Sequence, residues 1–262
     1  MTVRALLLAI ALLWPALAAS PVLAQTREPI LIPEISQHEV VVRQGFTGAN
    51  LLLYGAVLQP DGTRATGEVP YDIVVVLKGP TEAITLREKR RIWGMWINAD
   101  SAQFRSAPAY YAVASSRPLS EIVDSRTAAI YELGLESLQL SPIGAIRPEE
   151  VSRFVAGLVA KRMASGLYVQ DEGAVTISEG VLYQVRIPLP SSVMTGDYTA
   201  ETFAISDGRV IASATSEVTV TKRGFERAVE LWSRNLSMIY GLMAVALSVF
   251  MGWAAGRIFA LG

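Results

Sequence analysis

The chain has 262 residues, of which 23 are basic and 24 acidic, with one histidine and no cysteine. The lack of cysteine excludes disulfides, so a domain exported to an oxidising compartment would depend on an ordinary hydrophobic core. A net charge of −1 gives no indication of a surface that binds nucleic acid.

The first 24 residues have the composition of an export signal. Arg4 precedes an apolar stretch that is too short to span a bilayer, and a small-x-small pattern follows at 22–24. Cleavage there would leave Gln25 as the mature N-terminus; cleavage at 16–18 and retention as an uncleaved anchor are the alternatives. Without its two apolar ends the chain keeps roughly 200 residues, enough for one well-buried domain or two small ones.

From residue 30 onward the pattern is that of short β-strands. Runs rich in β-branched residues are separated by turn-forming residues, as at 45–48, at 60–62 and at Gly79-Pro80. The run at 73–77 contains no polar residue, which predicts a strand buried on both faces. The expected strands lie at 38–43, 49–58, 71–77, 83–86, 95–98 and 110–114.

The periodicity changes at Pro118, where a short helix is expected, followed by a second one from Asp124 to about Gly134. The most regular helical pattern runs from 148 to 165 and ends before Gly166, a residue that favours a helix C-cap. Its apolar residues recur at helical spacing and predict one buried face. They are Val151, Phe154, Val155, Leu158 and Val159.

After this insert the strand pattern returns. The sequence at 206–208 is typical of a hairpin turn. Met194 and Tyr198 lie in a segment that resembles the tyrosine corner of immunoglobulin-like domains, with Ala200 where a disulfide cysteine would stand. We therefore expect a mainly β protein, an Ig-like β-sandwich or two sandwich halves, with a helical insert at about 118–166. The expected strands here lie at 174–177, 181–187, 198–206, 210–214 and 217–221.

A second apolar run, 236–255, has no charged residue and is flanked by Arg234 and Arg257. A helix that rises 1.5 Å per residue turns this run into about 30 Å, the thickness of the hydrocarbon core of a bilayer. The run predicts one transmembrane helix at 236–256, preceded by a juxtamembrane helix at 222–235.

An export signal followed by a C-terminal span predicts a single-pass protein of the inner (plasma) membrane. Its domain, 25–221, would lie in the periplasm, and a short tail, 257–262, in the cytoplasm. The positive-inside rule argues for the opposite orientation because of the basic residues before the span, but long domains translocate largely regardless of charge. Those basic residues are Lys222, Arg223, Arg227 and Arg234.

Small residues recur every four positions along the expected span, at Ala244, Ser248, Gly252 and Gly256. Such a stripe lets a second helix approach closely, which predicts an integral membrane partner in addition to the lipid bilayer. The alternative is that glycine and alanine are simply frequent in membrane helices.

Little in the sequence indicates catalysis. The only histidine, His38, stands at the head of an expected strand, and the adjacent acids Asp171 and Glu172 fit a solvated turn. No glycine-rich phosphate-binding motif is present, and we expect no cofactor and no metal site. The sequence thus favours a protein that is not an enzyme, although carboxylates from distant parts of the chain could still form a pair.

The most unusual stretch is 87–98, where four cations precede Trp93 and Trp96. Arg90 and Arg91 with the two tryptophans could bind an anion, a lipid head group or an acidic partner, since guanidinium groups pair well with indole rings. The alternative is a strand with its charges in water and its tryptophans in the core. Downstream, Phe104, Tyr110 and Tyr111 fit either surface anchors or core residues.

The segments 71–80, 87–98 and 110–119, with Tyr240-Gly241-Leu242 and Gly252-Trp253, resemble an alphaproteobacterial family of transmembrane proteins of unknown function. The resemblance implies an exported domain on a single span. It also implies a gene neighbour that is similar to permeases of the TauE/SafE type. Two functions follow: an accessory or assembly subunit of a membrane complex, or a periplasmic module that senses an anion or lipid.

Overall fold

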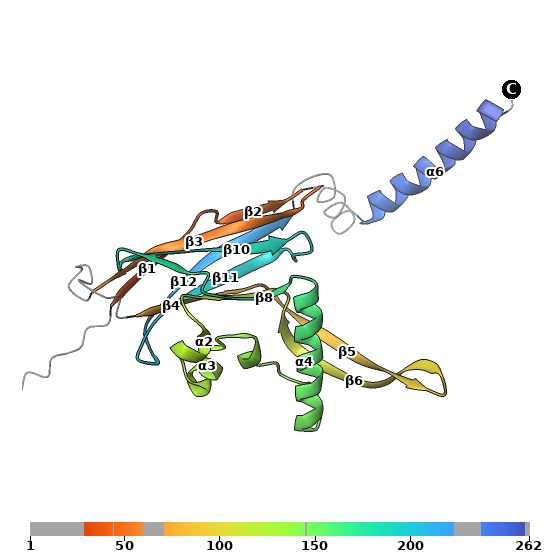
Figure 1. Cartoon of the computed structure of the whole chain (residues 1–262). Coiled ribbons are helices and arrows are strands. Elements are labelled where there is room, and N and C mark those ends of the chain that lie inside the picture. Colours follow the sequence, from red (N-terminus) through yellow and green to blue (C-terminus); the bar gives the residue numbers. More distant parts are fainter. Residues whose placement is uncertain (1–28, 44, 60–70, 145, 223–236, 260–262) are drawn as a thin grey trace, which may run out of the picture.

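The computed structural model describes residues 29–43, 45–59, 71–144, 146–222 and 237–259 (Figure 1). Four predictions concern residues outside these ranges. They are the export signal with its cleavage site, the turn at 60–62, the juxtamembrane helix and the cytoplasmic tail beyond residue 259.

The described residues confirm a mainly β protein with two principal sheets. One sheet consists of β1 (Ile30–Ile35), β3 (Gly48–Leu58), β10 (Leu182–Pro190) and β9 (Thr176–Ser178), paired in that order. The other consists of β2 (Glu39–Val42), β12 (Arg209–Lys222), β11 (Gly196–Ser206), β4 (Asp72–Lys78), β7 (Tyr111–Ser115) and β8 (Tyr168–Glu172), in that order. β5 (Thr81–Ile92) and β6 (Met95–Pro108) form a separate hairpin.

The two sheets share one core. Alternate residues of β10 are buried, and Tyr183 reaches from β10 to β11, where its hydroxyl lies 3.4 Å from the Thr202 hydroxyl. In β4, residues 73–77 are all buried, as the sequence predicted. One face of the larger sheet meets the smaller sheet, and helices cover the other, as the contact between the rings of Tyr131 and Phe203 shows.

The helical insert is where the sequence predicted it. It comprises α2 (Leu119–Ile122), α3 (Ser125–Tyr131), the 3-10 helix η1 (Leu135–Ser137) and α4 (Pro148–Ala164). Asp124 caps α3 by accepting a hydrogen bond from the Thr127 amide at 2.8 Å. After α4, Gly166 has a positive φ of 68° and donates its amide hydrogen to the Met163 carbonyl, the expected C-cap.

Several strand boundaries differ from the prediction. β5 and β6 are long strands of one hairpin, whereas the sequence suggested two short ones, because their charged and polar residues hide the strand pattern. β8 was missed because Tyr168 is its only buried residue. β12 is one continuous strand rather than two, and the turn at 206–208 joins it to β11 as expected.

Tyr198 makes the hydrogen bond expected of a tyrosine corner. Its hydroxyl donates to the Met194 carbonyl at 2.7 Å, and burial raises the pKa of Tyr198 to about 12. The ring of Tyr198 packs closely on Gly79, in the turn after β4. A Cβ added to Gly79 would lie only 2.8 Å from Cε1 of Tyr198.

The C-terminal helix α6 (Ser237–Phe259) is 23 residues long. Its described side chains, Met238 and those of 241–257, are exposed except for the half-buried Ala254. Ser248 donates a hydrogen bond to the Ala244 carbonyl at 2.9 Å. Judged on the described residues alone, no helix combines the length and the apolar character of a membrane span.

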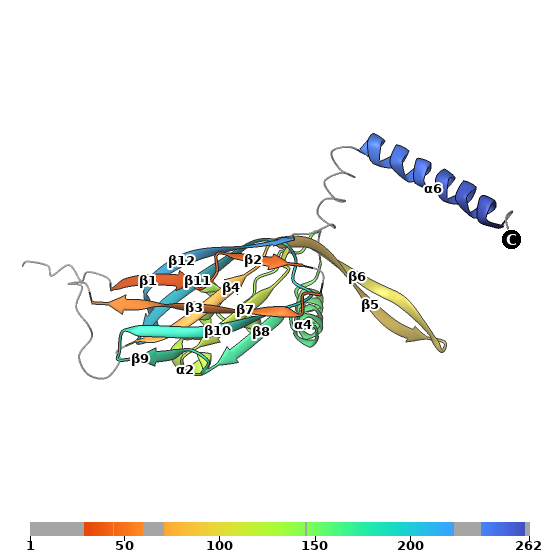
Figure 2. The same ribbon diagram turned by 90° about the horizontal axis from the view of Figure 1, so that it is seen from above.

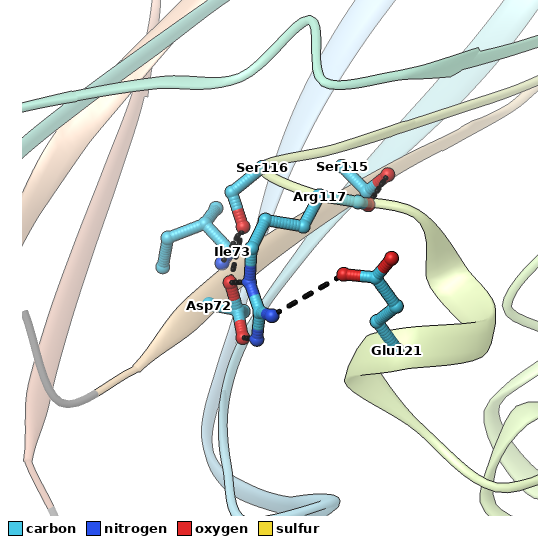
Figure 3. Close-up of polar contacts among 6 residues, drawn as sticks. All are labelled: Asp72, Ile73, Ser115, Ser116, Arg117 and Glu121. Atoms are coloured by element: carbon cyan, nitrogen blue, oxygen red, sulfur yellow. Dashed lines mark hydrogen bonds and ion pairs between the residues drawn. The ribbon is translucent and has the colours of Figure 1, made fainter.

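A polar cluster joins the start of β4 to the β7–α2 connection (Figure 3). Arg117 donates two hydrogen bonds to the Asp72 carboxylate, at 2.9 and 2.5 Å, and Ser116 donates a third at 2.8 Å. Glu121 lies 3.5 Å from the other side of the guanidinium. The hydrogen bonds from Arg117 are the main reason that the pKa of Asp72 is lowered below its usual value, despite partial burial.

We expect Tyr198→Phe to lower the free energy of unfolding by about 1 kcal/mol, because the Met194 carbonyl loses its donor. Urea unfolding of the full chain in detergent measures this loss. The exposed Tyr54 provides a matched control, and Tyr54→Phe should change the stability by less than about 0.5 kcal/mol. Equal effects of the two substitutions would contradict the role given to Tyr198.

The lowered pKa of Asp72 predicts a pH dependence of stability. The ionised carboxylate stabilises the fold above its unfolded-state pKa of about 3.9, and this contribution is lost as the pH falls through the lower folded-state value. Asp72→Asn should therefore be less stable than the native chain at pH 7, and the difference should shrink below about pH 4. Unfolding curves from pH 3 to 7 test this, with the exposed Asp171→Asn as control; a constant difference would refute it.

Candidate interaction site at the hairpin tip

The β5–β6 hairpin projects from one end of the two sheets (Figures 1 and 2). The strands pair antiparallel from Thr81 opposite Pro108 to Ile92 opposite Met95. At about 3.4 Å per residue the 12 residues of β5 extend about 40 Å. We call residues 89–98 the hairpin tip, because all ten of them are exposed.

The root of the hairpin is fixed to the domain through β6. Ala102 and Phe104 are buried in the common core. A segment that follows η1 pairs with this part of β6. The Arg105 amide donates to the Ser141 carbonyl at 3.0 Å, and the Ile143 amide donates to the Gln103 carbonyl at 2.8 Å. The hairpin is therefore anchored along its lower half.

Helix α4 supports the hairpin from one side. Arg162 forms an ion pair with Glu82 near the root. Farther out, the Arg153 guanidinium lies 3.0 Å from the Glu88 carboxylate and 3.5 Å from that of Asp100. These contacts end where the hairpin tip begins.

A two-residue turn closes the hairpin. Trp93 and Gly94 both have positive φ angles, 52° and 80°, as a type I′ turn requires. Asparagine, aspartate and glycine are the usual residues there, and a bulky side chain in this backbone region is strained by about 1 kcal/mol or more. The turn therefore carries a tryptophan at a cost to local stability.

The tip exposes a continuous apolar run. Trp93 is 96% exposed, Trp96 68% and Met95 67%, and the flanking Ile92 and Ile97 are about two-fifths exposed. The reading that placed the tryptophans in the core was therefore wrong, because this part of the hairpin extends beyond both sheets and has no core to pack against. Contiguous exposed apolar surface indicates an interaction site.

Cations of β5 lie beside and behind the apolar run, since Arg91 is paired with Trp96 and Arg90 with Ile97. Arg90 forms an ion pair with Asp100 at 2.8 Å, and the Arg91 side chain donates to the Gly94 carbonyl at 3.2 Å. Arg87 and Lys89 are exposed, and within the described ranges neither has a carboxylate within ion-pair distance. Part of this positive charge is therefore not neutralised by the protein.

The arginines and tryptophans of the tip lie close together, but they do not stack. In the described part of the chain, the guanidinium found over an aromatic ring is that of Arg153, 5.6 Å from the centre of the Phe154 ring. The indole rings of the tip, 96% exposed in Trp93 and 68% in Trp96, are therefore largely available to another molecule.

The other candidate residues have structural roles or are solvated. Phe104, Tyr110 and Tyr111 are fully buried. They are therefore core residues and not surface anchors. His38 is exposed and lies 3.2 Å from the Glu34 carboxylate. Asp171 and Glu172 are exposed at the end of β8, a strand rather than the expected turn. Among the described residues, no group of three histidine, aspartate or glutamate side chains is arranged to hold a metal ion.

The sequence did not predict an open groove along α4. Phe154 and Leu158 are buried, but the other three residues of the predicted face are only half-buried. These valines line a groove of about 1160 Å³ with leucines from the segment around η1. The helical periodicity gave the apolar face correctly, but it could not show that the neighbouring segment leaves it partly open. The lining residues are Val151, Val155, Val159, Leu135, Leu138 and Leu140.

The sequence model of a family described as "Putative transmembrane protein (Alph_Pro_TM)" matches residues 30–260. The match includes both sheets, the hairpin and α6. No curated protein matches the chain significantly. The description of the family assigns no activity to its members.

We expect Trp93→Asn to leave the free energy of unfolding unchanged or to raise it, since the ring is exposed and asparagine favours this turn. Phe104→Ala, in the same hairpin but fully buried, should cost about 3–5 kcal/mol. Urea unfolding of both variants checks the contrast. A loss of more than about 1 kcal/mol in Trp93→Asn would mean that the ring packs within the chain.

Proposed function

The chain belongs to this family of transmembrane proteins, and from that premise we propose that it is anchored in the inner membrane by α6, with residues 25–221 in the periplasm. The export-type composition of the first 24 residues supports this topology. So does the run at 236–255, which contains no charged residue and precedes Arg257 in the last turn of α6.

We infer further that the periplasmic domain is an Ig-like sandwich with a helical insert. In chain order β1, β3, β4, β9, β10, β11 and β12 correspond to strands A to G. On that assignment the smaller sheet has the order A-B-E-D, and the larger contains G-F-C, the arrangement of immunoglobulin constant domains. The hydrogen bond from Tyr198 at the start of strand F adds support.

We propose that the protein is a non-enzymatic accessory or assembly subunit of a membrane complex. One observation carries this proposal: α6 presents an open stripe of small residues, since a Cβ added at Gly252 or Gly256 would meet no atom of the described residues within 4 Å. The candidate residues Arg90, Arg91, Trp93 and Trp96 lie apart from this stripe on a protruding and exposed tip, which is suited to a second contact with a large surface. A sensor for a small anion is less well supported, because the ion pair of Arg90 and the exposure of both tryptophans leave no enclosed site at the tip.

The proposed partner is an integral membrane protein, such as a permease similar to the TauE/SafE type. The contact would be made by the stripe Ala244, Ser248, Gly252 and Gly256 on α6. This stripe is open: among the described residues, a Cβ added at Gly252 or at Gly256 would meet no atom within 4 Å. Small residues allow a second helix to approach the backbone closely.

Gly252→Leu or Gly256→Leu should abolish co-purification of the partner and leave insertion in the membrane intact, because leucine fills the contact but remains apolar. Affinity purification from native membranes in mild detergent, followed by mass spectrometry, measures the first effect, and resistance to alkaline extraction the second. Ala246→Leu places the same side chain on the other side of the helix and should retain the partner. Retention in the glycine variants would show that the stripe makes no contact.

A further inference from the structure

We propose that the hairpin tip binds the surface of the same bilayer in which α6 is anchored. Trp93, Met95 and Trp96 would enter the interface between head groups and acyl chains, and the cations behind them would contact lipid phosphates. This inference rests on the proposed anchor, but it assigns a ligand to a different part of the molecule.

The order of residues along the tip matches the layers of a membrane surface. The turn from Ile92 to Met95 forms the apex, and Arg91, Arg90 and Lys89 follow it one, two and three residues farther back. In the hairpin register Arg91 is level with Trp96, and Arg90 with Ile97. At about 3.4 Å per residue the cations lie about 3–10 Å behind the apex. Interfacial segments enter the membrane by about 5–10 Å, tryptophan favours the head-group level, and basic residues bind anionic head groups.

The tip is apolar and basic on both of its faces. Arg91 lies opposite Trp96 in the hairpin, and the next pair, Arg90 with Ile97, points to the other face. Both pairs are exposed. A protein partner would cover one face of such a hairpin, whereas a lipid surface surrounds an inserted tip on all sides. The chemistry therefore favours lipid over a folded partner.

The hairpin leaves the domain at the end from which the chain continues toward α6. The register places Gly196 opposite Val220, near the end of β12, and the position of a Gly196 Cβ is 3.1 Å from Pro80, at the hairpin root. Figures 1 and 2 show the hairpin projecting from this end. Lys222, the last described residue before α6, lies two residues beyond Val220.

The hairpin and the segment between β12 and α6 can extend over similar distances. The hairpin extends about 40 Å from its root. The 14 residues from 223 to 236 can span at most about 50 Å when fully extended. The tip can therefore reach the bilayer surface while α6 remains inserted.

The test uses the full chain, which has no native cysteine. Met95→Cys places a single label, the fluorophore NBD, on the tip and keeps both tryptophans. Ser178→Cys labels an exposed residue of β9 at the opposite end of the domain. Each labelled chain is reconstituted in nanodiscs of phosphatidylcholine and phosphatidylglycerol, where both membrane surfaces are open to solvent.

We expect the Met95 label to emit at shorter wavelength, to be quenched by doxyl-labelled lipid and to be several-fold less accessible to iodide than the Ser178 label. Adding Trp93→Asn and Trp96→Ser to the Met95→Cys chain should remove most of this protection. Equal iodide quenching of the two labels would overturn the proposal. Protection in native membranes but not in pure lipid nanodiscs would also overturn it and would identify a protein as the ligand of the tip.

Failure of the anchor can be told apart from failure of this inference. Release of the unlabelled chain from native membranes by alkaline carbonate would contradict the span at α6. The quenching of the Met95 label by doxyl lipid reports the tip contact separately, because it depends on where the tip lies and not on how the chain resists extraction.

Discussion

The connection between β4 and β5 is the constraint on which the rest of the molecule depends. The Gly79 amide donates to the Tyr110 carbonyl and the Ala109 amide to the Pro80 carbonyl, both at 2.8 Å. Tyr198 lies so close to Gly79 that no larger residue fits there. These two bonds continue the pairing of β4 with β7 into the root of the hairpin. Both strands of the hairpin therefore start from the buried strands of the larger sheet.

Two further tyrosines extend this connection to its surroundings. Tyr110 donates to the Pro188 carbonyl of the smaller sheet at 2.6 Å, and Tyr168 donates to the Pro108 carbonyl at the end of β6 at 2.9 Å. Burial raises the pKa of both phenols well above the usual value, so they remain hydrogen-bond donors at any physiological pH. The same residues that close the core thus set the direction in which the hairpin projects.

The sequence predicted correctly those parts of the structure that follow from a local pattern of residues. The unbroken apolar run of β4, the capped helix α4 and the tyrosine corner were all found where local chemistry placed them. The sequence left the hairpin tip open between a binding site and a strand with buried tryptophans, because apolar residues also suggest burial, and burial depends on whether a core lies within reach. That is a property of the fold and not of the tip. The groove along α4 escaped prediction for the same reason.

A chain tied to a membrane at one point leaves its domain free to tilt and rotate over the surface. The proposed contact at the hairpin tip would remove most of this freedom, because the hairpin root is bonded to the core and Arg153 on α4 supports the hairpin as far as Glu88. With α6 anchored as proposed, the tip would stay near the bilayer, the second contact would be intramolecular, and even a weak affinity would suffice to populate it. On this proposal the small, strained and exposed apex would be adequate for a contact that orients the domain. A partner held by α6 would then meet the domain in one defined orientation.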